Sequence, residues 1–132
     1  MSQENIEIAR AALAAWNARD LVGFMELQHP EVEMTLPRNL LEGGSYQGRE
    51  GARRAFQDAV ESWEVNDVRI ERMEAVDDSV VALGRAFNVA RDGGPSVDYE
   101  LGLLIRVRDD QIAELRSFLS HADALNAVGL EE

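Results

Sequence analysis

The chain has 132 residues, of which 45% are hydrophobic and 29% charged, the mixture of one ordinary globular domain. Its formal net charge of −12 argues against nucleic acid and membranes as partners, since anionic surfaces are bound through a positive face. Cysteine is absent, which excludes disulfides and thiolate metal sites. There is no bilayer-length apolar run and no signal-peptide pattern at the N-terminus, so we expect a cytoplasmic protein.

Three segments in the first half of the chain show helical spacing of apolar residues. The first covers residues 4–19, with a stripe formed by Ile6, Ala9, Leu13 and Trp16. Asp20 is a suitable N-cap for a short second helix that Pro30 should end. The spacing predicts a third helix over residues 49–63, after a short strand at 32–36 and a glycine-rich loop at 37–44.

After Trp63 the apolar period changes from that of a helix to that of a strand. The pattern predicts strands that start near Val68 and then cover residues 79–91, 96–108 and 112–119, joined by tight turns rich in aspartate and glycine. Ser120 is placed to cap a last short helix, with Gly129 as its stop.

Helices followed by antiparallel strands are typical of an α+β fold, here a single domain over residues 1–132. Long strands without proline, joined by tight turns, favour a bent meander. Helices that cover its concave face would leave an internal pocket.

Several local strings, in this order, resemble the SnoaL-like family of the nuclear transport factor 2-like superfamily. They are Trp16-Asn17-Ala18-Arg19-Asp20-Leu21, His29-Pro30-Glu31-Val32, Tyr46-Gln47-Gly48-Arg49-Glu50-Gly51, the strand at 80–85 and the ending at 124–130. The resemblance implies a cone-shaped half-barrel, with a strongly curved, mostly antiparallel sheet wrapped around N-terminal helices and an internal pocket. It also implies a homodimer, usually through the outer face of the sheet. It does not specify an activity, because the superfamily includes isomerases, cyclases, epoxide hydrolases, dehydratases and binding proteins.

The resemblance gives a test of one activity, that of ketosteroid isomerase. That enzyme needs a carboxylate base, a tyrosine and a protonated aspartic acid. The positions that match these roles hold Met34, Ala12 and Leu103. We therefore predict that this chemistry is absent. The Asp-Arg-Asp arrangement of the epoxide hydrolases has no match either.

Strand alternation predicts which side chains enter the cup. In the strand at 79–91 the bulkier set of alternate residues, which includes Leu83 and Phe87, is assigned to the interior. Arg85 lies in the middle of that set. A guanidinium there would hold a carboxylate or enolate oxygen of a ligand. The alternatives are an internal ion pair, or a bulge that turns Arg85 to solvent.

The other predicted ligand-binding residues are aromatic or apolar. Trp16 and Trp63 would close the pocket from the helices, Tyr46 would lie at its mouth, and its wall would include Tyr99, Leu103 and Phe87. His29 and the loop residue Glu42 are candidate bases, although a helix end for His29 and a solvated loop acid for Glu42 are the favoured interpretations. No metal or cofactor site is predicted, because the two histidines lack partners at ligand spacing.

Three hypotheses follow for the function. The first is a protein that binds an apolar small molecule, with a carbonyl or carboxylate group near Arg85. The second is a cofactor-independent isomerase, cyclase or dehydratase of the SnoaL-like kind. The third is a structural homodimer whose cup is filled by its own side chains.

Overall fold

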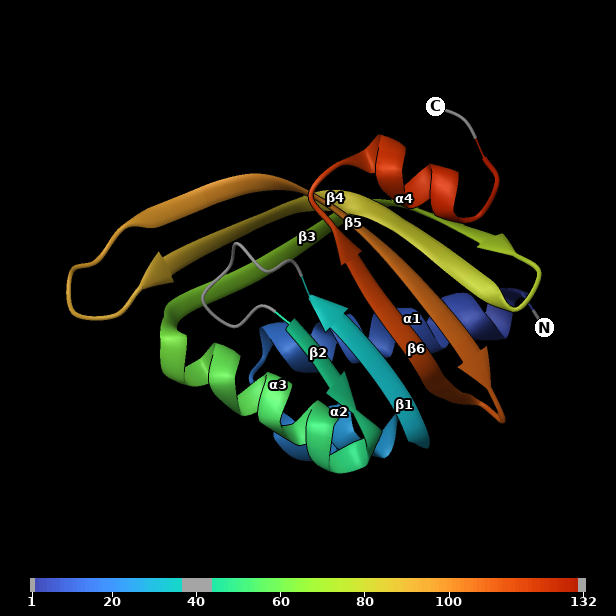
Figure 1. Ribbon diagram of the computed structural model, residues 1–132, viewed down its shortest axis with the longest axis horizontal. Helices are drawn as coiled ribbons and strands as arrows, with labels where there is room; N and C mark the ends of the chain where they lie inside the picture. Colours follow the sequence, from blue (N-terminus) through green and yellow to red (C-terminus); the bar gives the residue numbers. More distant parts are fainter. Residues whose placement is uncertain (1, 37–43, 131–132) are drawn as a thin grey trace.

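The computed structural model describes residues 2–36 and 44–130. Its helices are α1 (Ser2–Asn17), α2 (Leu21–Glu26), α3 (Gly48–Ser62) and α4 (His121–Ala127). Its strands are β1 (Gln28–Leu36), β2 (Gly44–Gln47), β3 (Trp63–Val76), β4 (Ser79–Ala90), β5 (Ser96–Arg108) and β6 (Gln111–Phe118). They form one curved sheet in the order β2-β1-β6-β5-β4-β3, antiparallel except for the pair β1–β6 (Figure 1). The predicted α+β half-barrel is confirmed.

The N-terminal helices lie on the concave side of the sheet (Figure 1). Alanines of α1, such as Ala9 and Ala12, are buried there against strand residues such as Leu101 and Ile105. Small residues on the helix bring it close to the sheet, and branched residues on the strands fill the remaining space. This cluster is the main core of the protein.

The outer, convex face of the sheet is covered at one end by α4 (Figure 1). Val81, Leu83 and Leu104 pack there against Ala124 and Leu125 of the helix, in a second core cluster. Both faces of β4 are therefore buried along its first half, residues 79–84.

Side-chain hydrogen bonds hold α4 on the sheet. The Ser120 hydroxyl accepts from the Asp123 amide as the predicted N-cap. A carboxylate oxygen of Glu100 accepts from the His121 amide at 2.6 Å. The His121 Nε2–H donates to the carbonyl oxygen of Gly84 at 2.8 Å. The helix is thus attached to two strands by groups outside its own backbone.

The sheet bends sharply where β3 crosses β4 at Gly84. A Cβ atom on Gly84 would overlap the carbonyl oxygen of Arg69. The register of β3 shifts next to this point, between Ile70 and Arg72. Glycine lets the two backbones approach and so sets the curvature of the cup.

Three element boundaries differ from the sequence prediction. Helix α2 ends at Glu26, and Pro30 lies inside β1. Strand β3 begins at Trp63, directly after α3. Residues 44–47, the first of which was assigned to the loop, form strand β2 against the end of β1. Glu42 and most of the predicted loop lie outside the described residues.

Candidate functional site

The main candidate site is a cavity of about 60 Å³ between the helices and the concave face of the sheet. Its walls come from α1, α2, β1, β3, β5 and β6. The described residues that line it are Ala12, Leu13, Trp16, Phe24, Met34, Leu36, Val68, Tyr99, Leu101, Leu103, Ile105, Leu115 and Ser117.

The lining is almost entirely apolar. Tyr99 and Ser117 carry its hydroxyl groups, and Trp16 carries an indole N–H. Among the described lining residues there is no carboxylate, histidine or arginine. The described wall therefore offers no group that takes up or releases a proton near neutral pH.

The three positions matched to ketosteroid isomerase are among the lining residues. Ala12 on α1, Met34 on β1 and Leu103 on β5 all face this cavity. They are 2% to 4% exposed. The cavity thus has apolar side chains at the three positions that the resemblance associates with the base and with the two oxyanion donors.

Arg85 does not enter the cavity, and its predicted inward orientation is wrong. Its guanidinium is about half exposed on the outer face and forms an ion pair with Asp98 at 2.9 Å. The residues of β4 that face the concave core are Val80, Ala82 and Ala86, the opposite set from the one predicted. No bulge in β4 is involved. The concave side is narrow at this strand and accepts the smaller side chains.

The reversed assignment of the two faces of β4 also affects two of its apolar residues. Phe87 is on the outer face and is 38% exposed. Leu83 packs under α4. The predicted placement of both in the wall of the cup is therefore wrong.

Three of the other predicted residues do line the cavity: Trp16, Tyr99 and Leu103. Trp63 is buried elsewhere, against Ala59 and Ala90. Tyr46 packs toward α3, where its hydroxyl donates to a carboxylate oxygen of Asp58 at 3.2 Å.

Phe24, Leu36 and Val68 line the cavity but were not predicted to do so. Phe24 had a local signal, since it belongs to the apolar stripe of the second helix. Its ring contacts those of Trp16 and Phe56, with centroids 5.6 and 5.1 Å apart. Contacts of this kind depend on how helices far apart in sequence pack together, which periodicity does not specify.

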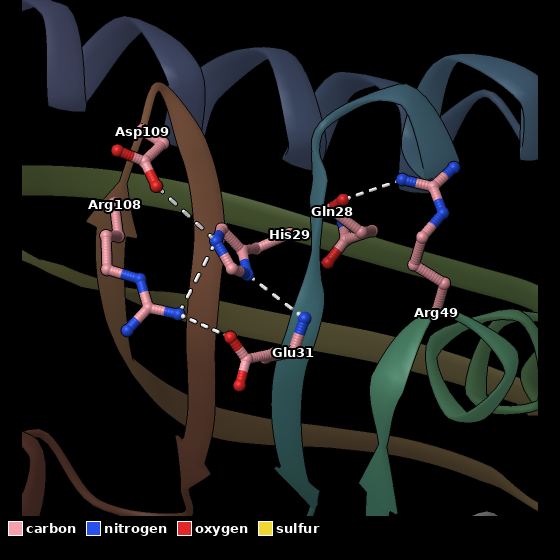
Figure 2. Close-up of polar contacts among 6 residues, drawn as sticks. All are labelled: Gln28, His29, Glu31, Arg49, Arg108 and Asp109. Atoms are coloured by element: carbon pink, nitrogen blue, oxygen red, sulfur yellow. Dashed lines mark hydrogen bonds and ion pairs between the residues drawn. The ribbon is translucent and has the colours of Figure 1, made fainter.

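A polar cluster lies at the start of β1, around His29 (Figure 2). The Nδ1 atom of His29 accepts from the Glu31 amide at 3.0 Å, so the proton of the neutral ring is on Nε2. Nε2 is 3.6 Å from a carboxylate oxygen of Asp109 and 3.4 Å from an Arg108 nitrogen. His29 is buried among these groups and is not one of the described residues that line the cavity. The hypothesis that it is a base inside the cup is not supported.

Residues 2–36 and 44–130 hold no group of three or more His, Asp or Glu side chains that could bind a metal ion. The helices of this part of the chain are too short or too polar to cross a membrane.

Comparison with solved structures supports the fold assignment. The chain resembles TerC co-crystallized with polyporic acid, with a TM-score of 0.78, 20% identity and coverage of 95% of this chain and 97% of that one. It resembles an NTF2-like protein of unknown function from Burkholderia pseudomallei, with a TM-score of 0.79, 19% identity and coverage of 98% and 99%. It also resembles a protein of ketosteroid isomerase-like fold from Catenulispora acidiphila, in complex with trimethylamine, with a TM-score of 0.76, 19% identity and coverage of 94% and 93%.

At these identities the structural likeness shows the fold alone. No curated protein is significantly similar in sequence. The family assignment rests on the sequence itself, which matches the SnoaL-like domain over residues 9–115. This match covers most of the chain and includes every described lining residue of the cavity except Ser117. The protein therefore belongs to the SnoaL-like domain family.

Proposed function

We propose that this protein binds a small, largely apolar molecule in the inner cavity. The observation that carries the proposal is an apolar cavity between α1 and the sheet, next to the main core. Voids that can hold more than a water molecule are uncommon in protein interiors and reduce stability. Apolar cavities of this kind stay dry and accept apolar guests.

The volume limits the size of the guest. A cavity of about 60 Å³ is smaller than the roughly 150 Å³ that holds benzene in another protein. The unaltered cavity suits a guest of a few heavy atoms. A larger ligand requires a lining side chain, such as Leu13 or Trp16, to move.

The chemistry of the wall favours binding over acid–base catalysis. An isomerase, cyclase or dehydratase without a cofactor needs a group that moves a proton next to the substrate. The described wall lacks carboxylates and histidines, and Arg85 and His29 lie elsewhere. The enzyme hypothesis would need its base from outside the described lining.

Two structural relatives support a site for small organic molecules. TerC was crystallized with polyporic acid, and the Catenulispora acidiphila protein with trimethylamine. We infer from these two relatives that the fold can accommodate small organic molecules.

Xenon provides a direct test of the cavity. In the wild-type protein we expect xenon to shift the NMR methyl signals of Leu103 and Leu115, which line the cavity. Ala12→Leu should fill the void and abolish these shifts. Ala11→Leu is the matched control, since Ala11 is an exposed neighbour on the same helix, and it should leave them unchanged. Equal shifts in all three proteins would contradict the proposal, as would their absence from the wild type, which would favour the filled, structural cup.

We also propose that the uncovered part of the outer face mediates a homodimer. Val65 and Phe87 are 37% and 38% exposed there, and Val65 pairs with Val89 of β4. The small residues Ala82, Gly84 and Gly102 do not contribute to this uncovered surface. Ala82 and Gly84 belong to the concave set, and Gly102 lies under Ala124 of α4.

The dimer proposal is tested by size-exclusion chromatography with light scattering. A dimer is expected for the wild type at micromolar concentration, and Phe87→Asp should shift it to monomer because the substitution buries a charge in the interface. Val22→Asp is the control, since Val22 is 69% exposed on α2, on the other side of the sheet. A wild-type monomer, or a dimer unaffected by Phe87→Asp, would contradict the proposed interface.

A further inference from the structure

Asn88 is one of the few buried polar residues among those that the structure describes. It lies near the end of β4 and is 1% exposed. By strand alternation it shares the concave face with Ala82 and Ala86, which belong to the main core. Its partners in the neighbouring strands are Asn66 of β3 and Val97 of β5.

Neither polar atom of the Asn88 side chain has a hydrogen-bond partner among the described residues. A buried amide without partners is strongly disfavoured, since its donor and its acceptor are both removed from water. An apolar residue of similar shape would fit this face without that penalty. The amide therefore calls for a partner that residues 2–36 and 44–130 do not supply.

The position of Asn88 relates it to the inner cavity. Ala86 lies two residues before Asn88 on β4, about 7 Å from it. The partners of Ala86 in the neighbouring strands are Val68 and Tyr99, and both line the cavity. Asn66 lines a second, much smaller void of about 10 Å³. Trp16 contributes to the walls of both voids. Asn88 is not among the described residues that line either void, but it follows the cavity wall along β4, and its strand partner Asn66 lines the smaller void.

We propose that Asn88 anchors the polar group of the ligand, a neutral molecule that carries a carboxamide or lactam at one end of an apolar body. This inference rests on the proposed binding function. The Asn88 amide presents one donor and one acceptor side by side, which a carboxamide or lactam complements with two hydrogen bonds. Movement of the Trp16 ring joins the two voids and lets the head group reach Asn88.

The charge of the ligand follows from the same surroundings. An ionised carboxylate would satisfy only the donor of Asn88. Arg85 is on the outer face. Arg19 lines the second void, but its guanidinium already donates to the carbonyl oxygens of Trp63 and Glu64, at 2.8 and 2.6 Å. The site therefore selects a neutral head group, in place of the anionic group expected near Arg85.

The test uses two probes of the same shape, isobutyramide and 2,3-dimethyl-1-butene, in which a methyl and a methylene group replace the amide nitrogen and oxygen. Dissociation constants are measured by NMR titration for the wild type and for Asn88→Leu. We expect Asn88→Leu to weaken isobutyramide binding about tenfold, the effect of losing two hydrogen bonds, and to change hydrocarbon binding by less than about twofold. Asn126→Leu makes the same change at an exposed position of α4 and should affect neither probe.

Thermal unfolding without a probe gives an independent measurement. Asn88→Leu should melt at or above the wild-type temperature, because it removes a buried amide that has no partner. A lower melting temperature together with unchanged isobutyramide binding would overturn the proposal and indicate an amide satisfied by internal water. Asn88→Ala, which fits beside Ala86 and Ala90, gives the same comparison if the leucine variant does not fold.

The results separate the two proposals. If the wild type binds the hydrocarbon and the Asn88→Leu substitution changes the affinity for both probes by the same factor, the anchor role is wrong and the apolar site remains. If the wild type binds neither probe, the binding function itself fails, and the anchor role fails with it.

Discussion

The two faces of β4 are both buried near its start, yet they differ in what they contact. The concave face presents small residues such as Ala82 and Ala86 to the helices and the cavity. The convex face presents Val81 and Leu83 to α4, and beyond α4 it presents Arg85 to solvent. The larger side chains are on the face that is covered by a single short helix.

This difference shows that side-chain size is a poor guide to the inside of a strongly curved sheet. Space is short on the concave side of a bend, so the strand at the bend carries alanine and glycine there. The convex side diverges and admits larger residues. Substitutions on β4 and β5 test whether the two faces differ in this way.

Gly84→Ala should be the most disruptive substitution, because its Cβ would overlap the backbone carbonyl of Arg69. We expect a loss of about 3 kcal/mol or more in the free energy of unfolding, measured by urea denaturation. Gly102→Ala places a Cβ against Ala124 on the convex side. Because α4 can shift outward, that variant should lose only about 1 kcal/mol. Equal losses would mean that the bend at Gly84 is no more rigid than the packing of α4.

Leu103 and Leu104 are adjacent, equally buried and on opposite faces, so they form a matched pair. Replacing either one with alanine should lower the free energy of unfolding by about 3 kcal/mol through lost packing. Only Leu103→Ala enlarges the inner cavity.

Benzene distinguishes these two variants. It should raise the melting temperature of Leu103→Ala by binding the native state, and should leave Leu104→Ala unchanged. A similar response from both variants would show that the void under α4 is as accessible as the cup.

Arg85→Leu should have the smallest effect. The Arg85–Asp98 ion pair is more than half exposed on each side, and such pairs contribute at most about 1 kcal/mol. We expect unchanged binding of xenon and isobutyramide, and a change in unfolding free energy within about 0.5 kcal/mol. Asp98→Asn should behave in the same way. If Arg85→Leu lost ligand binding and Asp98→Asn did not, Arg85 would be a ligand-binding residue after all.

The sequence predicted most elements and one wall of the cavity. In β5 the alternation is unambiguous, because Leu101 and Leu103 are flanked by Glu100 and Gly102, and its inward face is as predicted. In β4 both sets of alternate residues are apolar up to Gly84. The prediction therefore depended on side-chain size, which selected the wrong face.

Two of the boundary errors arise where the local sequence pattern is ambiguous or too short to be informative. Trp63 continues the helical spacing of Phe56 and Val60, and it is also the first residue of β3, so the two periods overlap there. Strand β2 is four residues long and pairs with β1 at Met34 and Leu36. A strand that short carries little periodic signal of its own and depends on its partner.

Helix α4 covers only part of the outer face, and this sets how much of the sheet is available to other molecules. Its removal would expose Val81, Leu83 and Leu104 next to the region that already includes Phe87. The apolar surface would then run along most of β4, a surface prone to uncontrolled association. The polar attachment of α4 to Glu100 and Gly84 thus keeps this apolar surface covered.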